Sequence, residues 1–444
     1  MGAFDVSAEL DQLSRTGTVF KESAILAGVY LDGQGTVTDP LDELTGLAEA
    51  AGVQVLDKIV QRRRKPEVAT YIGTGKLDEL KTVVDARDAD LVIFDNDLAP
   101  SQTKNLEEVL NVRVLDRTEL ILDIFASRAR TSEARLAVEL AQLEYSLPRL
   151  KRMWSHLERQ GVGGVGLRGP GEKQLEVDRR LAQKRILDLK KNLKEIHVRR
   201  QREVSSRKNS SRTVSLVGYT NAGKSTLLNR LTDSDVYVKD QLFATLDTRT
   251  RRWHLPNWGP VLLSDTVGFI RDLPHHLVAS FRATLEEANQ ADLLLHIADA
   301  SSVDVHEQID AVYQVLTALG IREKDTLLVL NKMDAVDSDV LTMLLQKYPN
   351  AAAISAKSGL RLETLAVKVS DALSKEFLDL TITASVSNGS LAAMLAKEGE
   401  ILSKQYTDET AVFHCRLPRY ALGRLQRIPG ITVHGLPERE PEKW

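Results

Sequence analysis

Cysteine is almost absent from this 444-residue chain, because Cys415 is the only one. A lone cysteine excludes a disulfide framework and any zinc module built from several cysteines. The sequence has no apolar run of about 18 residues, which argues against a membrane-spanning helix, and its N-terminus lacks the basic and apolar segments of a secretory signal. We therefore expect a soluble, multidomain, cytoplasmic protein, with peripheral attachment to a membrane left open.

A strong excess of charge of one sign is also absent, because 59 Lys and Arg nearly balance 62 Asp and Glu. The charge is nevertheless uneven, since residues 149–212 hold 19 Lys and Arg against 7 Asp and Glu. A basic segment in an otherwise acidic chain is typical of a protein that binds a polyanion. A solvated helical linker explains the same charge equally well, because Lys and Arg favour helices.

The first part of the chain alternates short apolar runs with amphipathic stretches. This alternation predicts an α/β domain with a mainly parallel sheet. The expected strands are 24–31, 53–56, 91–94 and 112–115, and the expected helices are 41–51, 77–86 and 101–110. The string Gly73-Thr-Gly75-Lys76 is not a phosphate-binding loop, since Thr70 stands where the first glycine is needed, and we expect a turn before a helix there.

Two heptad patterns follow this domain. The first runs through Leu136, Leu140, Leu143, Leu147, Leu150, Trp154 and Leu157, and the second through Ala182, Ile186, Leu189, Leu193 and Ile196. Such seams predict two helices that pair as an antiparallel coiled-coil hairpin. Pro148 should kink the first helix, because it lacks an amide donor and crowds the preceding turn.

The connection between these helices, residues 161–171, contains six glycines and Arg168. Its letters include G-x-G-x-x-G, but a dinucleotide-binding turn must follow a strand and open a helix, and this segment follows a helix. We interpret it as a flexible tip that can approach a polyanion closely, with a mere flexible connector as the alternative. The polar residues after Val204 are expected to form a linker to the next domain.

The clearest motif matches the phosphate-binding pattern G-x-x-x-x-G-K-S/T, and it stands between an apolar strand at 213–217 and a helical stretch at 226–231. Its backbone amides would wrap the phosphates at the start of the helix. Lys224 would reach the β- and γ-phosphates, and the Ser225 hydroxyl would bind Mg²⁺. The nucleotide-contacting residues expected here are Gly218, Tyr219, Thr220, Asn221, Ala222, Gly223, Lys224, Ser225 and Thr226.

Two further segments complete the phosphate end of the expected site. Asp265 ends a strand at 261–264 and can hold Mg²⁺, generally through water, while the Gly268 amide would contact the γ-phosphate. A threonine between the motifs normally completes the Mg²⁺ coordination, and the residues alone do not choose between Thr245 and Thr248. The other contacting residues expected here are Phe243, Ala244, Leu246, Asp247, Thr266 and Val267.

The base is predicted by a segment that follows the apolar strand 326–330. The Asp334 carboxylate can accept hydrogen bonds from N1 and N2 of guanine, which adenine does not offer in that arrangement. Lys332 can lie along the base, Asn331 can tie the segment to the phosphate loop, and Met333 lies between Lys332 and Asp334. The segment Ser355-Ala356-Lys357 can offer backbone amides to the guanine O6. The four motifs in this order predict GTP rather than ATP.

Two departures from the plainest GTPase pattern carry information. Phe269 follows Gly268, where many GTPases place a glutamine that orients the attacking water, so intrinsic hydrolysis should be slow and depend on a partner or a monovalent cation. Asn221 can help to coordinate a K⁺ ion near the transferred phosphate, or it can simply stabilise the loop through a hydrogen bond.

Taken together, these residues resemble the HflX family of translation-factor-related GTPases. The resemblance rests on YIGTGKLDEL, the connector GGVGLRGPGEKQLEVDRR, GYTNAGKSTLLNRL, QLFATLDTRTRR and the stretch 265–287. Thr248 stands where the family pattern has proline, a difference that concerns the stiffness of the segment. The resemblance matches Thr245 to the Mg²⁺ ligand, so Lys224, Thr245 and Gly268 become the expected catalytic residues and Ser225, Thr245 and Asp265 the expected Mg²⁺ ligands.

The resemblance also implies a function and a domain order. Family members bind the large ribosomal subunit in the GTP state, reach toward its peptidyl-transferase region with the glycine-rich tip, and split stalled or idle ribosomes, notably under heat stress. We expect a monomer with an N-terminal α/β domain (1–130), a helical hairpin (131–210), a P-loop GTPase domain (211–373) and a small α+β domain (374–444). The alternatives are a large-subunit assembly or dormancy GTPase, and an RNA remodeller driven by ATP through the N-terminal domain.

Overall fold

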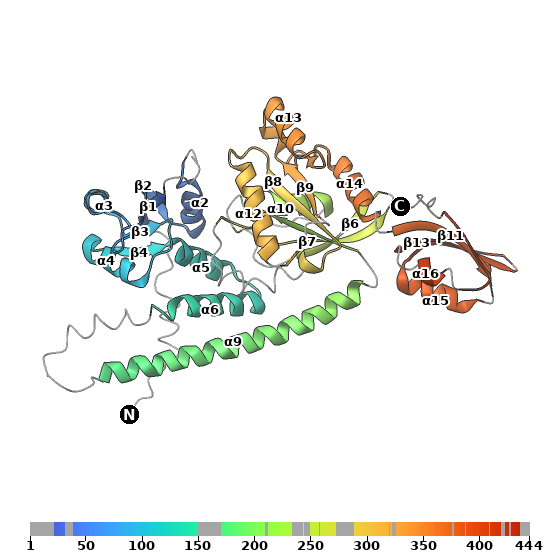
Figure 1. Cartoon of the computed structure of the whole chain (residues 1–444), viewed down its shortest axis with the longest axis horizontal. Helices are drawn as coiled ribbons and strands as arrows, with labels where there is room; N and C mark the ends of the chain where they lie inside the picture. The colour runs from blue at the N-terminus through green and yellow to red at the C-terminus, as the bar shows by residue number, and fades with distance from the viewer. Residues whose placement is uncertain are drawn as a thin grey trace, which may run out of the picture.

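The computed structural model describes most of the chain. The described ranges are 22–31, 39–149, 170–208, 212–232, 243, 249–256, 258–271, 288–318, 320–321, 326–374, 377–386, 388–407, 409–418, 422–425 and 428–435. Three sheets organise these residues into three units that lie in a row, and one long helix runs beneath the first two (Figure 1). No helix in the described ranges is both long and apolar enough to cross a membrane.

The N-terminal unit is a parallel sheet in the order β2-β1-β3-β4 with helices on both faces. Its elements are β1 (Ser23–Leu31), α2 (Asp42–Ala51), β2 (Gln54–Arg63), α3 (Thr74–Arg87), β3 (Leu91–Phe94), α4 (Pro100–Leu110), β4 (Arg113–Asp116) and α5 (Arg117–Arg128). One apolar cluster lies between the sheet and α2 with α5, and a second lies between the sheet and α3 with α4. The central strands are therefore buried on both faces, which explains their continuous apolar runs.

The expected α/β domain with a parallel sheet is confirmed, with one difference in length. Strand β2 extends to Arg63, well beyond the predicted 53–56. Its second half, KIVQRR, contains charged residues because β2 lies at the edge of the sheet and is mostly half-buried. The turn expected before a helix at Gly73 is also present, because Gly73 has an extended backbone and directly precedes α3.

The helical pair consists of α6 (Ser132–Ser146) and α9 (Pro170–Lys208). Its seam is formed by the predicted heptad residues Leu136, Leu140, Leu143, Leu147, Ile186, Leu189 and Leu193. Ion pairs of 2.7 Å join Arg185 to Glu139 and Lys190 to Glu144. Glu139 and Arg185 each directly precede a seam residue, and Glu144 and Lys190 each directly follow one. Ion pairs between such equivalent positions of the two heptads are expected for antiparallel helices.

Three expectations for this region need correction. Helix α6 ends at Ser146 instead of continuing through a kink at Pro148, because a helix rarely passes the residue before a proline. Helix α9 continues to Lys208, so residues 205–208 are helical and not a linker. Pro170 and Gly171 belong to α9 rather than to the tip, while residues 161–169 of the tip and Leu150, Trp154 and Leu157 of the seam lie outside the described ranges.

The central unit is a six-stranded sheet in the order β10-β9-β8-β5-β7-β6, in which only the edge strand β6 is antiparallel to its neighbour. Its strands are β5 (Thr213–Gly218), β6 (Arg249–Leu255), β7 (Gly259–Asp265), β8 (Leu293–Asp299), β9 (Thr326–Asn331) and β10 (Ala352–Ala353). Its helices are α10 (Lys224–Thr232), α12 (Val305–Ala318), η2 (Met333–Ala335), α13 (Ser338–Lys347) and α14 (Leu362–Ser374). The parallel strands bring their carboxyl ends to one edge, where ligands bind in such sheets.

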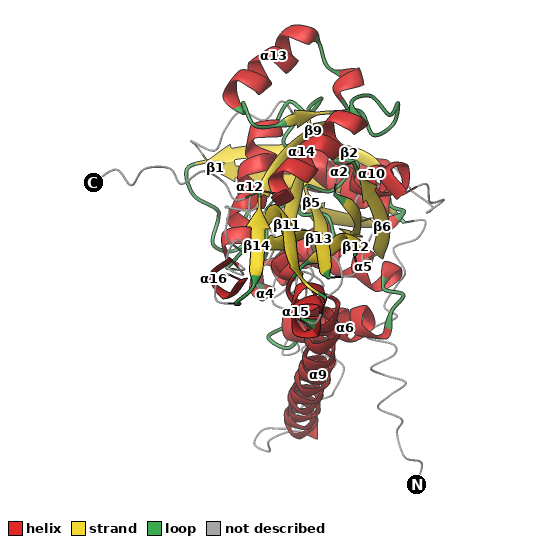
Figure 2. Ribbon diagram, turned by 90° about the vertical axis from the view of Figure 1, so that its right-hand side faces the viewer, coloured by secondary structure: helices red, strands yellow, loops and turns green. Residues whose placement is uncertain are grey.

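The C-terminal unit has the chain order β-α-β-β-α-β and an antiparallel sheet in the order β12-β13-β11-β14. Its elements are β11 (Phe377–Ser385), α15 (Gly389–Glu398), β12 (Glu400–Tyr406), β13 (Thr410–Pro418), α16 (Leu422–Leu425) and β14 (Ile431–His434). Its apolar cluster lies between the sheet and the two helices. In Figure 2 this unit faces the viewer and α9 extends below the sheets. The expected small α+β unit is confirmed.

The N-terminal and central units share one apolar cluster. Helix α5 contributes Phe125, and the central unit contributes Phe243, Phe269 and Ile270. The rings of Phe125 and Phe243 meet edge to face, with their centroids 4.6 Å apart. The two units are therefore packed together next to the phosphate loop, an arrangement that nothing in the local sequence indicated.

Candidate nucleotide site

The phosphate loop connects β5 to α10, and two of its positions require glycine for steric reasons. Gly218 has φ of 150°, and a Cβ there would lie 2.1 Å from the carbonyl oxygen of Ile297. Gly223 has φ of 92°, and a Cβ there would lie 2.3 Å from Nδ2 of Asn331. Both positions combine a positive φ with a close neighbour, so only glycine allows the chain to wrap into this loop.

Lys224 begins α10, and its side chain turns back across the loop. Its Nζ donates hydrogen bonds to the carbonyl oxygens of Gly218 at 3.0 Å and Tyr219 at 2.7 Å. Burial lowers the pKa of Lys224 to about 8, against the opposing effect of Asp265. An incoming phosphate would stabilise the charged form, so this lysine is well placed to bind an anion.

The expected Mg²⁺ ligands that the structure describes lie side by side. The Ser225 hydroxyl donates a 2.6 Å hydrogen bond to Oδ2 of Asp265, which is fully buried at the end of β7. The adjacent Thr266 is also buried, and its hydroxyl donates to the carbonyl oxygen of Leu216 at 2.7 Å. A serine hydroxyl beside a carboxylate offers the hard oxygen ligands that Mg²⁺ prefers, so the residues present fit this ion.

Gly268 packs tightly against the phosphate loop. A Cβ at this position would lie 2.8 Å from Cα of Thr220 and 3.1 Å from Nζ of Lys224. The next residue bonds to the loop through its backbone, because the carbonyl oxygen of Phe269 accepts from the Thr220 amide at 2.7 Å and its amide donates to Gly218 at 3.1 Å. The Phe269 side chain is buried in the apolar cluster shared with the N-terminal unit. This phenyl ring cannot orient a water molecule.

The base-binding segments are tied to the phosphate loop by one buried side chain. Asn331 donates through Nδ2 to the carbonyl oxygen of Ala222 at 2.8 Å and accepts at Oδ1 from the Ala356 amide at 2.9 Å. Lys332 follows with φ of 62°, and its Nζ lies 2.7 Å from Oδ2 of Asp299. A single asparagine thus holds three loops together at the carboxyl edge of the sheet.

Asp334 lies on the exposed side of this arrangement, in the 3-10 turn η2 together with Met333. A hydrogen bond from Ser355 lowers the pKa of Asp334, so its carboxylate is ionised at neutral pH. Ser355 and Ala356 are buried, and Lys357 is exposed. An ionised, exposed carboxylate beside backbone amides is suited to recognise a base that offers donors and an acceptor on one edge.

The structure does not describe every expected residue of the site. Ala244, Thr245, Leu246 and Asp247 lie outside the described ranges. Phe243 is described and is buried, and its amide donates to Oγ1 of Thr220 at 2.9 Å. Val267 is buried, and Thr226 lies in the first turn of α10. Among the described residues, the motifs therefore converge on one edge of the central sheet, although they come from segments more than 100 residues apart.

Sequence reasoning missed the residues of the N-terminal unit that approach this site. The Tyr219 hydroxyl accepts from the Arg271 amide at 2.7 Å, and it also forms a hydrogen bond with Glu43 of α2. Arg117 of α5 donates through Nη2 to the carbonyl oxygen of Arg271 at 3.2 Å. The one available signal was an arginine directly after the apolar strand β4, and that signal does not identify its partners.

Comparisons with known proteins agree with this geometry. Three family models match consecutive parts of the chain: GTP-binding GTPase N-terminal over residues 38–126, GTP-binding GTPase Middle Region over 128–207, and 50S ribosome-binding GTPase over 213–332. The chain is similar to GTPase HflX of Escherichia coli (strain K12), with 45% identity over 396 residues that cover 87% of this chain and 91% of that protein.

Further relatives give the same picture. The chain is 42% identical over 401 residues to GTPase HflX of Lacrimispora saccharolytica, which covers 90% of this chain and 94% of the relative. Among solved structures, it is similar to a GTP-binding protein from the hyperthermophilic archaeon Sulfolobus solfataricus in complex with GDP, at 25% identity and a TM-score of 0.41, covering 80% of this chain and 99% of that one. The alignments with the two sequence relatives cover 87% and 90% of this chain.

Proposed function

Because this chain belongs to the HflX family of GTPases and hydrolyses GTP, we propose that it uses this activity on the large ribosomal subunit and splits stalled or idle ribosomes under stress. The observation that carries the nucleotide part of the proposal is the buried Asn331, which fastens the base-binding segments to the phosphate loop. The partner is supported by the model for residues 213–332, which is described as a 50S ribosome-binding GTPase.

We assign roles to the site residues accordingly. The amides of residues 221–225 hold the phosphates at the start of α10, and Lys224 neutralises the β- and γ-phosphates. Ser225 and Asp265 would hold Mg²⁺ together with Thr245, as the family pattern indicates. The metal supplies positive charge to the phosphate oxygens when it is bound. Asp334 accepts from guanine, with the amides of residues 355–357 directed at O6.

Slow intrinsic hydrolysis follows from Phe269. Its ring is buried against the N-terminal unit, so the position that carries glutamine in many GTPases cannot orient the attacking water. Asn221 is exposed with φ of 59°, and the described residues offer its side chain no hydrogen bond. This favours coordination of K⁺ over a purely structural role for the asparagine amide. Further help would come from the ribosomal partner.

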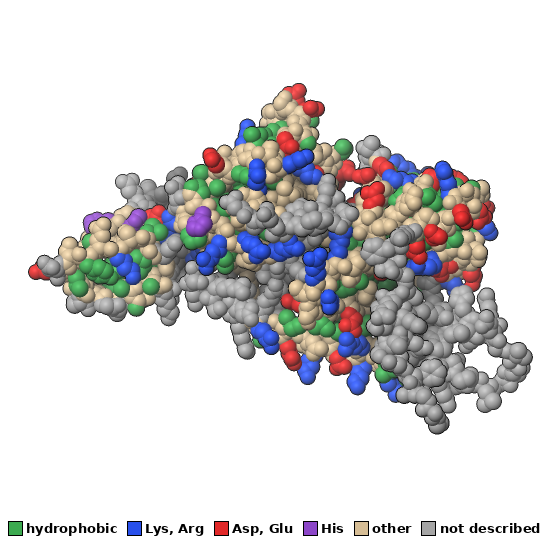
Figure 3. Space-filling view, turned by 180° about the vertical axis from the view of Figure 1, so that it is seen from behind, with side chains coloured by type: hydrophobic (Ala, Val, Ile, Leu, Met, Phe, Trp, Pro, Cys, Tyr) green, Lys and Arg blue, Asp and Glu red, His purple; other side chains and the backbone are tan. Residues whose placement is uncertain are grey.

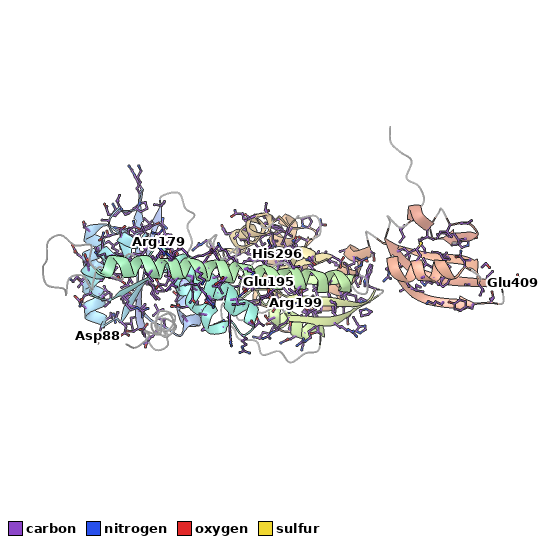
Figure 4. All side chains as sticks on the ribbon, turned by 90° about the horizontal axis from the view of Figure 1, so that it is seen from below. Asp88, Arg179, Glu195, Arg199, His296 and Glu409 are labelled. Carbon is purple, nitrogen blue, oxygen red and sulfur yellow. The ribbon has the colours of Figure 1, made fainter. Side chains whose placement is uncertain are left out.

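Attraction to ribosomal RNA is assigned to the helical hairpin. Along α9, side chains such as Arg179 and Arg199 project outward from the helix (Figure 4), and Lys184, Lys191 and Lys194 are also exposed. The view from behind adds a band of Lys and Arg side chains across the middle of the molecule (Figure 3). Such surfaces bind RNA phosphates with an affinity that falls as salt rises.

The nucleotide would control this binding through the two segments nearest the γ-phosphate. Contacts from the γ-phosphate to Thr245 and to the Gly268 amide order these segments and favour docking on the large subunit. Hydrolysis removes the contacts, and the protein is released. The glycine-rich tip, residues 161–169, would then leave the peptidyl-transferase region.

The alternative of an ATP-driven N-terminal unit has little support in the described residues. The carboxyl edge of its sheet carries Asp95 and Asp116, and both carboxylates pair with arginines, Arg117 and Arg149. Buried carboxylates repel a phosphate, and the sequence pattern G-x-x-x-x-G-K-S/T does not occur in residues 22–130. We therefore assign nucleotide chemistry to the central unit alone.

Ribosome splitting by the wild-type chain and by Lys224→Ala tests the proposal. With GTP, we expect the wild type to convert intact ribosomes into subunits, measured by light scattering or density gradients, and the variant to fail. If the wild type binds large subunits but leaves intact ribosomes unchanged, the assembly or dormancy alternative holds. If the variant splits ribosomes with ATP, the ATP-driven alternative replaces the GTPase mechanism.

A further inference from the structure

The strand order of the N-terminal sheet reverses in the way that marks ligand sites in α/β proteins, and we call the group of residues at this reversal, Tyr30, Glu43, Asp95 and Arg117, the acidic crevice. Chain order reverses between β1 and β3, because β1 connects to β2 on one side whereas β3 continues to β4 on the other. Ligands of open α/β sheets bind outside the carboxyl ends of the strands at such a reversal. Tyr30 near the end of β1 and Asp95 directly after β3 lie at this place, and Glu43 of α2 joins them.

Acidic side chains line this crevice, and one buried arginine fills part of it. Nη1 of Arg117 lies 2.6 Å from Oδ1 of Asp95, and Nη2 lies 2.7 Å from Oε1 of Glu43. The Tyr30 hydroxyl donates to Oδ2 of Asp95 at 2.8 Å. Burial raises the pKa of Asp95, against the opposing effect of Arg117. Two carboxylates with one guanidinium leave a negative charge in a nearly dry place, which a second cation can balance.

That second cation comes from the central unit. Arg271 lies three residues after Gly268, and its guanidinium approaches both carboxylates, with Nε 3.9 Å from Glu43 and Nη2 3.9 Å from Asp95. Its backbone is held as well, because its amide donates to the Tyr219 hydroxyl and its carbonyl oxygen accepts from Arg117. Both the side chain and the backbone of Arg271 are thus held at the place where the strand order of the N-terminal sheet reverses.

We propose that the acidic crevice of the N-terminal unit is a binding site for Arg271 and that GTP competes with this binding. The inference rests on the nucleotide site proposed above. With Arg271 bound, the Phe269 carbonyl oxygen accepts a hydrogen bond from the Thr220 amide. A Cβ on Gly268 would lie only 3.1 Å from Nζ of Lys224. Gly268 therefore packs directly against Thr220 and beside Lys224, where the γ-phosphate of GTP would enter. On this proposal GTP moves Gly268, and with it Arg271, whereas GDP lacks the γ-phosphate and leaves them in place.

Affinities of the full chain for GDP and for a non-hydrolysable GTP analogue test this inference. In Arg271→Ala the crevice loses its ligand, so we expect the affinity for the GTP analogue to rise about threefold to fivefold while the affinity for GDP stays unchanged. The matched control is Arg251→Ala, an exposed arginine on β6 for which no ion pair occurs among the described residues, and it should change neither affinity.

A second variant separates the crevice from other effects of removing an arginine. Glu43→Gln keeps the shape of the side chain and an acceptor for Arg117, so the unit should remain folded. If Arg271 is what the crevice binds, adding Glu43→Gln to Arg271→Ala should give no further change in the ratio of the two affinities. An unchanged ratio in Arg271→Ala, with normal binding of both nucleotides, overturns this inference alone. A wild type that binds no guanine nucleotide overturns the proposed function as well.

Discussion

The N-terminal and central units are two versions of one architecture with opposite chemistry at the same place. Both are parallel sheets between helices, and in both the functional side chains stand at the carboxyl ends of the strands. In the central unit that edge carries a glycine loop and Lys224, which suit an anion. In the N-terminal unit it carries Asp95 and Glu43, which suit a cation. The architecture provides the position, and a few residues decide what binds there.

The contact between the units gives this difference a consequence. The acidic edge of one sheet holds Arg271, which follows Gly268 of the other, the residue proposed to contact the γ-phosphate. The aromatic contact of Phe125 with Phe243 joins the same two units. On the proposal above, the N-terminal unit responds to the nucleotide state of the central unit through Arg271.

The largest expected effect compares two similar lysines. Lys224→Ala should reduce GTP hydrolysis by about 10²-fold to 10³-fold, because it removes the charge that stabilises the transferred phosphate. Lys76→Ala changes the lysine of the similar string in the N-terminal unit, which pairs with Glu79 on the surface of α3, and should leave hydrolysis unchanged. Steady-state phosphate release measures both. A comparable loss in the two variants would contradict the division of roles between the units.

Base selection should also belong only to the central unit. Asp334→Asn should weaken GTP binding about 10-fold to 100-fold, because a charged acceptor for two guanine donors is lost. The new amide group can donate to the additional carbonyl oxygen of xanthine, so the affinity for xanthosine triphosphate should rise. Competition binding with a fluorescent nucleotide measures the exchange. Equal loss for both nucleotides would mean that Asp334 does not contact the base.

The two units should respond to pH in opposite directions. Burial raises the pKa of Glu119 to about 8 and that of Asp123 to about 6, so these folded carboxyls retain protons that the unfolded chain releases, and the N-terminal unit loses stability as pH rises from 5 to 8. Burial, assisted by Lys224, lowers the pKa of His296 to about 3. The unfolded histidine binds the proton first as pH falls, so the central unit loses stability from pH 7 to 5.

Hydrogen exchange resolved by peptide measures the two units separately. Between pH 5 and pH 8 the expected change is on the order of 5 kcal/mol in the N-terminal unit and on the order of 2 kcal/mol in the central unit, with opposite signs. Replacing His296 by a neutral residue of similar size should flatten only the dependence of the central unit. Parallel pH dependence of the two units would show that the buried groups do not dominate their stability.

The smallest expected effect concerns the hairpin. Lys191→Ala and Lys194→Ala should each weaken binding to large ribosomal subunits about twofold to threefold and lower the salt dependence by about one phosphate contact. Lys81→Ala on α3, another exposed lysine, is the matched control. Binding at several salt concentrations measures the slope. If the control changes the slope as much as the hairpin variants do, the attraction is general and not a property of α9.

Local sequence signals predicted the site well where the chemistry depends on spacing. The glycines of the phosphate loop, Asp265 at the end of β7 and Asn331 at the end of β9 could be found because each stands where an apolar run ends, at the edge of the sheet where ligands bind. Element ends were less predictable. Strand β2 was predicted too short, since its charged second half looks like a loop, and α9 runs four residues beyond the predicted linker boundary because Ser and Lys are tolerated in an exposed helix.

The contact between the units could not be predicted at all. Arg117 and Arg271 are 154 residues apart, and although Arg271 lies in the stretch 265–287 that carries the family resemblance, nothing in either segment points to the other. An arginine after an apolar strand is usually exposed, whereas Arg117 is buried between Asp95 and Glu43 of its own unit and the Arg271 carbonyl of the central unit. Long-range pairs of this kind carry no periodic or local signal, so they appear only when the fold is known.

The most direct test of the central claim is steady-state GTP hydrolysis by the purified chain in K⁺ buffer, with and without large ribosomal subunits. With Phe269 buried at the position of the usual glutamine, the account predicts slow hydrolysis by the protein alone and at least about tenfold stimulation by the subunits. Fast hydrolysis that large subunits do not change would contradict it, because the site would then need no partner to position the attacking water.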